Sequence, residues 1–143
     1  MKASRRDVRD CPCFSGLRYT ACCAPLHREE REAATPEALM RSRYAAFALG
    51  LGEYLVRTLT ADHPDRALDE AALARELSKA RERQRFLGLR IDEAWAEGDR
   101  GEVVFFARIF ERGKDCSFTE RSSFRRESGQ WRYEAGVIVT PER

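Results

Sequence analysis

Apolar residues recur at helical spacing in the first half of this chain and at strand spacing in the second half. A stripe with spacings of four, three and four residues predicts one buried face of a helix. The stripe consists of Met40, Tyr44, Phe47 and Leu51. Thr35 and Pro36 stand before it, where a capping hydroxyl and a first-turn proline favour the start of a helix. Two shorter helices are expected over 53–59 and 68–83, separated by a turn at 62–65.

The apolar pattern changes to a period of two residues after Arg85, which is typical of strands. Four strands are expected, over 87–91, 103–110, 117–125 and 131–137. Short polar segments that contain glycine separate the strands and predict turns at 97–99, 113–115 and 128–130. Helices followed by an antiparallel meander predict an α+β domain, with about three helices packed on a curved four-stranded antiparallel sheet.

The length and composition fit one domain with a small appendage. The chain has 143 residues, of which 43% are hydrophobic and 35% charged, so it can bury a core beneath a well-solvated surface. A polar, cysteine-rich segment precedes the first helix start, which divides the chain into a module over 1–32 and a domain over 33–143. No apolar run reaches the roughly 20 residues that cross a bilayer, and residues 1–7 lack the apolar stretch of a secretory signal. We therefore expect a cytoplasmic protein with no membrane span, in a compartment where thiols stay reduced.

Four cysteines lie close together near the N-terminus. Cys11 and Cys13 form one pair and Cys22 and Cys23 a second, within a segment too small to bury a core of its own. Two close thiolate pairs are a donor set for tetrahedral Zn²⁺, and four protein ligands leave no open position for catalysis. The sequence therefore predicts a structural zinc ion. A disulfide framework, inert buried thiols, and a site in which His27 replaces one cysteine are the alternative interpretations.

Arginines crowd the cysteine segment. They are Arg5, Arg6, Arg9, Arg18, Arg28 and Arg31. Zinc with four thiolates carries a formal charge of about −2, which nearby guanidinium groups can offset. The arginines form either a solvated basic face or a docking surface for RNA or an acidic partner. The net charge of +2 is too small to indicate nucleic-acid binding by itself.

A polar pair interrupts the apolar face of the third expected strand. Glu120 and Ser122 alternate with Phe118 and Phe124 on that face. If residues 113–115 form a three-residue loop, Arg108 lies directly opposite Glu120. Arg108 and Glu120 are then either a structural ion pair or part of a pocket that contacts a polar ligand.

His63 is the other histidine besides His27. It stands in the segment Asp62-His63-Pro64-Asp65, whose composition is typical of a surface turn, although flanking carboxylates can also orient a catalytic histidine. The sequence contains no glycine-rich phosphate loop and no paired carboxylates at a meaningful spacing. We assign no catalytic residue and keep His63 as a possible pocket residue.

The cysteine segment resembles the SEC-C motif, a small zinc module found in the SecA translocase ATPase. The matching residues are Cys11, Pro12, Cys13, Ser15, Gly16, Tyr19, Cys22 and Cys23. Phe14 departs from the motif, which usually has glycine there. A β-carbon disfavours left-handed backbone by roughly 1–2 kcal/mol, which favours a locally reshaped knuckle.

The rest of the chain resembles the YchJ family of bacterial proteins of uncharacterised function. The similar strings are Leu39–Phe47, His63-Pro64, Leu87–Leu89, Glu120–Phe124 and Gly129–Tyr133. This resemblance implies a domain of the nuclear-transport-factor-2-like (NTF2-like) type, a cone of curved sheet and helices that encloses a pocket. It implies no established activity.

Two functions follow as hypotheses. The first is a non-enzymatic adaptor whose zinc module docks on a protein or ribonucleoprotein partner; the resemblance to the translocase motif suggests a chaperone, translocation or ribosome partner. The second is a small-molecule-binding protein or enzyme that uses the pocket of the cone, where Arg108, Glu120, Ser122 or His63 would contact the ligand. A filled cone with an exposed basic module favours the first hypothesis, and an open pocket with converging polar groups favours the second.

Overall fold

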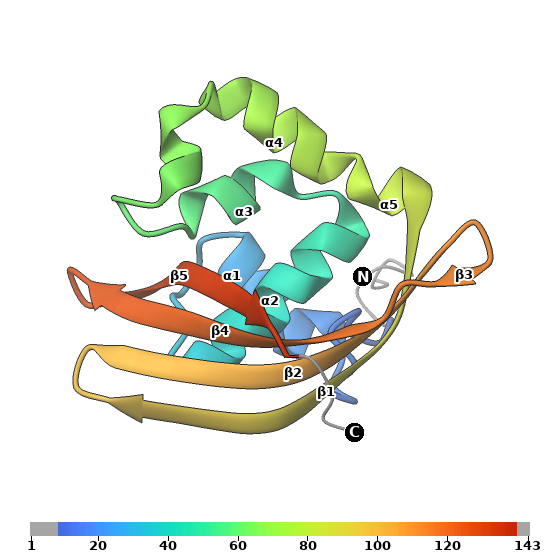
Figure 1. Cartoon of the computed structure of the whole chain (residues 1–143). Helices are drawn as coiled ribbons and strands as arrows, with labels where there is room; N and C mark the ends of the chain where they lie inside the picture. Colours follow the sequence, from blue (N-terminus) through green and yellow to red (C-terminus); the bar gives the residue numbers. More distant parts are fainter. Residues whose placement is uncertain (1–8, 140–143) are drawn as a thin grey trace, which may run out of the picture.

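The computed structural model describes residues 9–139, in which helices cover one face of a curved antiparallel sheet (Figure 1). The α-helices are α1 (Ala24–His27), α2 (Pro36–Leu49), α3 (Gly52–Arg57), α4 (Glu70–Ser78) and α5 (Ala80–Arg83). The 3₁₀ helices are η2 (Tyr19–Ala21) and η3 (Pro64–Ala67). The strands are β1 (Gln84–Glu97), β2 (Arg100–Glu111), β3 (Lys114–Asp115), β4 (Phe118–Glu127) and β5 (Gln130–Ile138). The predicted α+β architecture is confirmed; Arg5 and Arg6 lie outside the described residues.

Helix α2 begins as the sequence predicts and forms the centre of the molecule. Thr35 Oγ1 accepts a hydrogen bond from Ala38 N at 3.0 Å, and Pro36 occupies the first turn. The helix ends where Gly50 takes a φ of 74°, a left-handed conformation that glycine adopts without a steric cost. The predicted stripe residues Met40 and Tyr44 lie buried in the main core, between α2 and the sheet.

The segment after α2 is more interrupted than predicted. The helix expected over 68–83 is divided into α4 and α5, which meet at Lys79. Helix α3 approaches α4 so closely that a β-carbon at Gly52 would overlap the carbonyl oxygen of Ala74. Gly52 N also donates a hydrogen bond to Ser78 Oγ at 2.9 Å. The crossing therefore requires glycine because there is no space for a β-carbon.

The four predicted strands are present in the order β1-β2-β4-β5, and the two-residue β3 pairs with β2 alone. Every pairing is antiparallel. Register shifts interrupt β1 between Phe86 and Gly88 and again between Ile91 and Glu93. Such bulges bend a strand and increase its twist, which helps to curve the sheet around α2.

The turn between β2 and β4 differs from the predicted loop over 113–115. Arg112 and Gly113 form a two-residue turn with φ values of 52° and 78°, and Glu111 pairs with Lys114 on its far side. Positive φ at both central residues is typical of the tight hairpin turns whose twist matches that of the strands. The loop is therefore shorter than predicted, and the register of the following strand changes with it.

The predicted pairing of Arg108 with Glu120 is wrong. Phe105, three residues away from Arg108 on β2, lies opposite Glu120. Because three is an odd number, this shift also places Arg108 on the other face of the sheet. There Arg108 is exposed, and its guanidinium lies 5.5 Å from the centre of the Phe110 ring.

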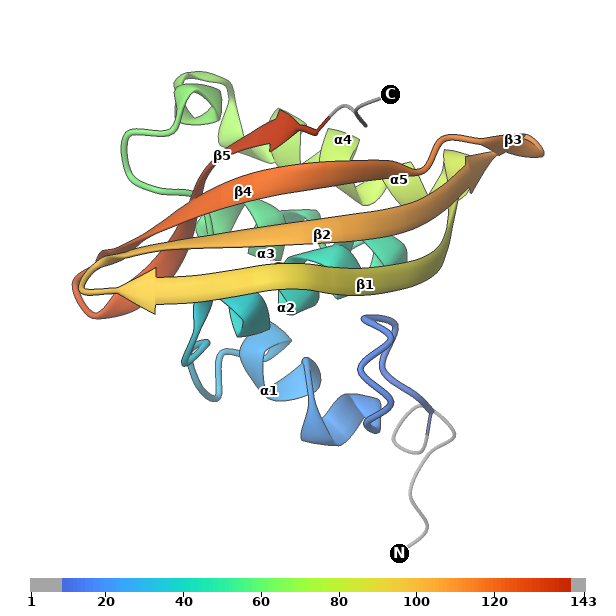
Figure 2. The same cartoon turned by 60° about the horizontal axis from the view of Figure 1, so that its bottom comes forward.

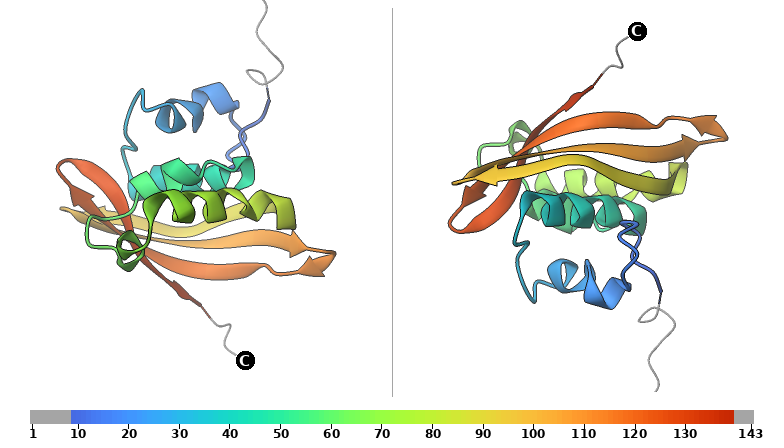
Figure 3. Two further views of the ribbon diagram at one scale, coloured as in Figure 1. Left: turned by 90° about the horizontal axis from the view of Figure 1, so that it is seen from above. Right: turned by 90° about the horizontal axis from the view of Figure 1, so that it is seen from below.

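The N-terminal segment lies along α2 beside the β1 edge of the sheet (Figures 2 and 3). We call its described part, residues 9–32, the cysteine module. Leu26 of the module belongs to the main core, and a second apolar cluster joins the cysteines to Ala45 of α2. Arg57 of α3 pairs with Glu29 and Glu32, with N–O distances of 3.2 and 3.5 Å. The module is therefore packed on the helical layer through both apolar and polar contacts.

Candidate metal centre and cavity

The sulfur atoms of the cysteine module converge on one point. The ligand atoms of Cys11, Cys13, Cys22 and Cys23 all lie within 4.8 Å of one another. Cys22 Sγ is 3.6 Å from Cys13 Sγ and 3.9 Å from Cys23 Sγ, and all four thiols are free of disulfides. Sulfurs bound tetrahedrally at about 2.3 Å from an ion are separated by about 3.8 Å. The four cysteines can therefore hold a metal ion.

A short loop carries the first cysteine pair. Cys11 N donates a hydrogen bond to Leu17 O at 2.9 Å, and Phe14 N donates one to Cys11 O at 3.1 Å. Phe14 takes a φ of 61° and Gly16 a φ of 86°. The β-carbon of Phe14 has therefore not driven the backbone out of the left-handed region, contrary to the expected local reshaping.

The packing of the thiols restricts how many of them ionise without a cation. Hydrogen bonds shared with Cys11 and Cys23 lower the pKa of Cys13. The hydrogen bond to Cys13 raises the pKa of Cys11 to about 12, and the hydrogen bonds with Cys11 and Cys13 raise the pKa of Cys23. The Cys13 thiolate therefore forms easily, whereas ionisation of Cys11 and Cys23 needs a compensating positive charge. A divalent cation among the sulfurs would supply that charge.

His27 lies beside the sulfur cluster but is engaged elsewhere. Its Nε2 donates a hydrogen bond to the carbonyl oxygen of Ser42 in α2 at 2.8 Å, so its Nδ1 accepts the hydrogen bond from the Tyr19 hydroxyl at 2.6 Å. Burial lowers the pKa of His27, in agreement with a neutral ring that donates once and accepts once. These contacts contradict the alternative in which His27 replaces a cysteine ligand.

The exposed surface of the module carries both apolar side chains and charges of either sign. Phe14 is 48% exposed and Leu17 is 53% exposed. The exposed charged residues are Asp10, Arg18, Arg28, Glu29, Glu30 and Arg31. Arg9 instead lies over the ring of Tyr19, with its guanidinium carbon 4.4 Å from the ring centre. The surface therefore differs from the uniformly basic face that the arginine count suggests.

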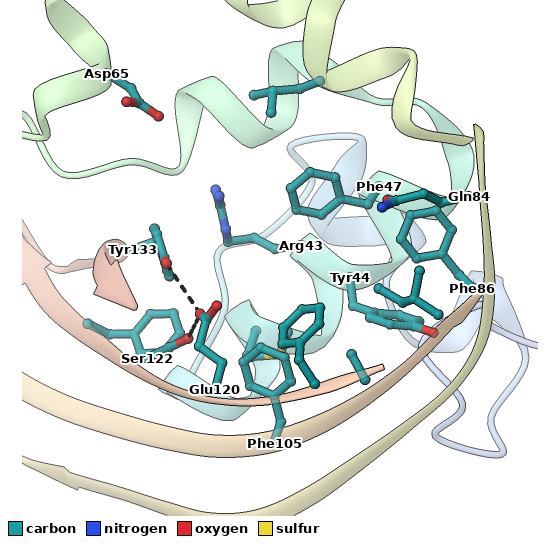
Figure 4. A pocket seen from close by; sticks show the side chains of 16 residues that line it. Arg43, Tyr44, Phe47, Asp65, Gln84, Phe86, Phe105, Glu120, Ser122 and Tyr133 are labelled. Atoms are coloured by element: carbon teal, nitrogen blue, oxygen red, sulfur yellow. Dashed lines mark hydrogen bonds between the residues drawn. The ribbon is translucent and has the colours of Figure 1, made fainter. Parts of the chain in front are cut away.

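A cavity of about 330 Å³ lies between the helices and the inner face of the sheet (Figure 4). Aromatic rings form much of its wall; they belong to Tyr44, Phe47, Phe86, Phe105 and Phe118. Polar side chains gather at the other end; they belong to Arg43, Asp65, Glu120, Ser122 and Tyr133. The cone is therefore open enough for a small molecule; one end is mainly aromatic and also carries Gln84, and the other end is polar (Figure 4).

Glu120 is held at the polar end by two donors. Its Oε2 accepts hydrogen bonds from Ser122 Oγ at 2.5 Å and from the Tyr133 hydroxyl at 3.3 Å (Figure 4). Burial raises the pKa of Tyr133 to about 12, so its hydroxyl stays protonated and donates. A β-carbon at Gly136 would overlap the Glu120 carboxylate, so glycine provides the space in which this cluster forms.

Arg43 is a buried cation at the same end of the cavity, and it is absent from the predicted pocket residues. It is 8% exposed, and its Nη1 donates hydrogen bonds to Leu55 O at 2.7 Å and to Thr58 Oγ1 at 2.5 Å. Burial lowers its pKa to about 10, so the guanidinium remains charged at neutral pH. Position 43 falls between Met40 and Phe47 on the apolar helix stripe, and that spacing is the signal that identifies it.

The structure brings together only part of the predicted pocket. Glu120 and Ser122 line the cavity, whereas Arg108 lies on the opposite face of the sheet. His63 Nδ1 accepts a hydrogen bond from Asp65 N at 3.0 Å in the turn before η3, and its ring centre lies 6.0 Å from that of Tyr133. His63 is therefore next to the cavity but not in its lining.

Comparisons with known proteins agree with this architecture. The family model described as "YchJ, middle NTF2-like domain" matches residues 35–136. The UPF0225 protein YchJ of Shigella dysenteriae is 42% identical over 129 residues, which cover 89% of this chain and 82% of that protein. Among the helices of residues 9–139, none is long and apolar enough to span a membrane.

Solved structures show the same fold. The solution structure of RPA3114, a SEC-C motif containing protein from Rhodopseudomonas palustris, has a TM-score of 0.80 and 40% identity, covering 92% of this chain and 100% of that one. A SEC-C motif containing protein from Psychrobacter arcticus has a TM-score of 0.77 at 22% identity, over 98% of this chain and 88% of that one. The cysteine cluster and the NTF2-like domain fit a metal-binding module joined to a cone. The chain belongs to the YchJ family.

Proposed function

We propose that this chain is a non-enzymatic binding protein in which Cys11, Cys13, Cys22 and Cys23 hold one structural zinc ion. The convergence of four sulfurs within 4.8 Å is the observation that carries the proposal. Four thiolates fill a tetrahedral zinc site, so the ion would stabilise the module and leave no position for a substrate. In this proposal residues 1–32 form the zinc module, residues 33–143 form the cone domain, and the protein is cytoplasmic because the thiols must stay reduced.

We further propose that the zinc module docks on a protein surface, free or within a ribonucleoprotein. Phe14 supports this, because it keeps a left-handed backbone where glycine would be unstrained and is 48% exposed. Leu17, in the same loop, is 53% exposed, and the neighbouring Arg18 is exposed as well. Exposed apolar side chains beside a charged residue are features of a protein-binding surface. A purely electrostatic RNA site would need a more uniformly basic face.

The docking proposal is tested by quantitative affinity capture from a bacterial lysate. Phe14→Gly combined with Leu17→Ser removes the apolar side chains and is expected to retain zinc, since neither side chain is a metal ligand. Recovery of the specific partner should fall at least tenfold, as expected for the loss of interface anchors. The matched control is Leu68→Ser, because Leu68 is 56% exposed on another element and its loss should change nothing. If the Phe14→Gly, Leu17→Ser variant recovers the same partners in the same amounts, docking through this surface is refuted. If nuclease treatment of the lysate removes the partner, the partner protein belongs to a ribonucleoprotein.

A second candidate function is the binding of a small molecule in the cone. The cavity of about 330 Å³ lies at the lower end of the range for ligand pockets, about 300–1,000 Å³. Its aromatic wall and its cluster of converging polar groups are the features that such pockets share. The cavity supports binding; no residue assigned here supports catalysis.

A further inference from the structure

Arg43 and Glu120 each keep a polar atom without a partner at the polar end of the cavity. Within residues 9–139, hydrogen bonds are formed by Nη1 of Arg43 and by Oε2 of Glu120, but not by Arg43 Nη2 or Glu120 Oε1. Figure 4 shows the guanidinium and the carboxylate facing the same space, on either side of Tyr133. The two groups therefore offer a ligand one donor and one acceptor.

The charge of Arg43 is not neutralised by an ion pair. None of the ion pairs formed among residues 9–139 includes it, although its guanidinium carbon lies 4.6 Å from the centre of the Tyr133 ring. A buried charge is costly unless it is paired, and stacking on a ring offsets only part of that cost. A guanidinium with free N–H donors in a cavity is suited to a carboxylate ligand, which it binds by charge-assisted hydrogen bonds.

The acidic groups around Arg43 define what else the ligand carries. Glu120 and Asp65 place two carboxyl side chains on the cavity wall, and Figure 4 shows Asp65 across the space from Glu120. A ligand with a carboxylate alone would face both of them. A ligand that also carries a protonated amino group would pair with Arg43 and with Glu120 at the same time.

The rest of the lining defines the body of the ligand. The ring of Phe86 lies edge-on to Tyr44, with ring centres 5.6 Å apart, and stacks on Phe47 at 6.5 Å. Phe105 and Phe118 contact each other edge-on at 6.2 Å. These rings present apolar surface on more than one side of the cavity, which suits a single aromatic ring or a branched aliphatic group.

Resting on the second candidate function above, we propose that the cavity binds a small zwitterion with an apolar body, of the class of apolar amino acids. The carboxylate of the ligand pairs with Arg43. Its amino group donates to Glu120, and its apolar side chain lies among Phe47, Phe86 and Phe105.

The test is an NMR titration of the zinc-loaded, full-length protein with four probes of similar shape. L-phenylalanine carries both charged groups, 3-phenylpropanoate only the carboxylate, phenethylamine only the amine, and toluene neither. L-phenylalanine should shift the amide signals of α2 and β4 with at least tenfold higher affinity than each of the other three, because each charge-assisted hydrogen bond is worth about ten- to a hundredfold in a desolvated site. If toluene binds with the same affinity as L-phenylalanine, the proposed zwitterionic ligand class is wrong. The cavity would then still be a binding site, but for apolar molecules. If none of the probes, toluene included, shifts these signals, the second candidate function is itself wrong.

Variants assign the two contacts. Glu120→Gln should reduce the affinity for L-phenylalanine at least tenfold and should not reduce that for 3-phenylpropanoate, whose carboxylate no longer faces the charge of Glu120. Arg43→Met should abolish binding of L-phenylalanine and of 3-phenylpropanoate, because both carry a carboxylate. If this variant fails to fold, the four probes on the unmodified protein still test whether a carboxylate is needed for binding. The control is Arg108→Met on the opposite face of the sheet, which should leave all affinities unchanged. Equal affinity of the Glu120→Gln variant for L-phenylalanine would refute the assigned amino contact.

Discussion

Replacing both Cys22 and Cys23 with serine should yield a protein that purifies without zinc and lacks an ordered cysteine module. The expected effect is large, because the apparent free energy of structural zinc binding in small peptides is about 10–16 kcal/mol. Cys11, Cys13 and Cys23 make up half of the buried residues of the second apolar cluster. The contacts that remain, such as that of Arg41 with Cys13 O, are single ones, so we expect residues 9–25 to lose their order once the metal is absent. Metal analysis together with hydrogen exchange of the amides in residues 9–34 measures both consequences.

The matched control for this variant is Cys116→Ser. Cys116 is an exposed free thiol outside the sulfur cluster, so its replacement should retain one zinc per chain and full protection of the module. Amide protection of residues 9–34 that survives in the metal-free variant would show that apolar packing, and not an ion, holds the segment folded.

Replacing His27 with leucine should destabilise the protein while zinc is retained. His27 joins the Tyr19 hydroxyl to the Ser42 carbonyl oxygen, over distances of 2.6 and 2.8 Å. Its loss leaves two partly buried polar groups without this partner, each at about 1–3 kcal/mol. We expect the free energy of unfolding in urea to fall by about 2–4 kcal/mol, because α2 then loses a polar contact with the module.

His63→Leu is the control for the His27 variant. His63 accepts one hydrogen bond from Asp65 N at the start of η3, so its loss should cost about 1 kcal/mol. A His27 variant that purifies without zinc would restore His27 as a metal ligand. A change in stability no larger than that of the control would show that the module is not coupled to α2 through this residue.

The cysteine cluster and α2 could be predicted because their signals are local. The four cysteines stand within thirteen consecutive residues, and a helix cap and a first-turn proline fix the start of α2. Neither depends on how distant parts of the chain pair. The same holds for the order of the strands, since each hairpin joins neighbours in the sequence.

The residues that line the cavity could be predicted only in part. Which of them face the cavity depends on the register between β2 and β4 and on which face of α2 the sheet covers. A turn at Arg112 and Gly113 in place of a three-residue loop moved Arg108 out of the cone and placed Phe105 opposite Glu120. The arginine in the cavity is Arg43, which lies on the apolar stripe of α2. Its spacing places Arg43 on that stripe, but only the sheet that covers the stripe shows that its charge is buried.

Helix α2 contacts both the cysteine module and the cavity. Arg41 Nη1 donates a hydrogen bond to Cys13 O at 3.1 Å, and Arg43, two residues further on, lines the cavity. Successive residues of one helix point to different sides, so α2 contacts the module and the cavity at once.

We expect sulfur-bound zinc to give the N-terminal segment its structure. Zinc K-edge X-ray absorption on freshly purified full-length protein, combined with metal analysis, tests it most directly. We expect one zinc ion per chain with four sulfur neighbours at about 2.3 Å. Absence of stoichiometric zinc, or a first shell in which nitrogen or oxygen replaces a sulfur, would contradict it.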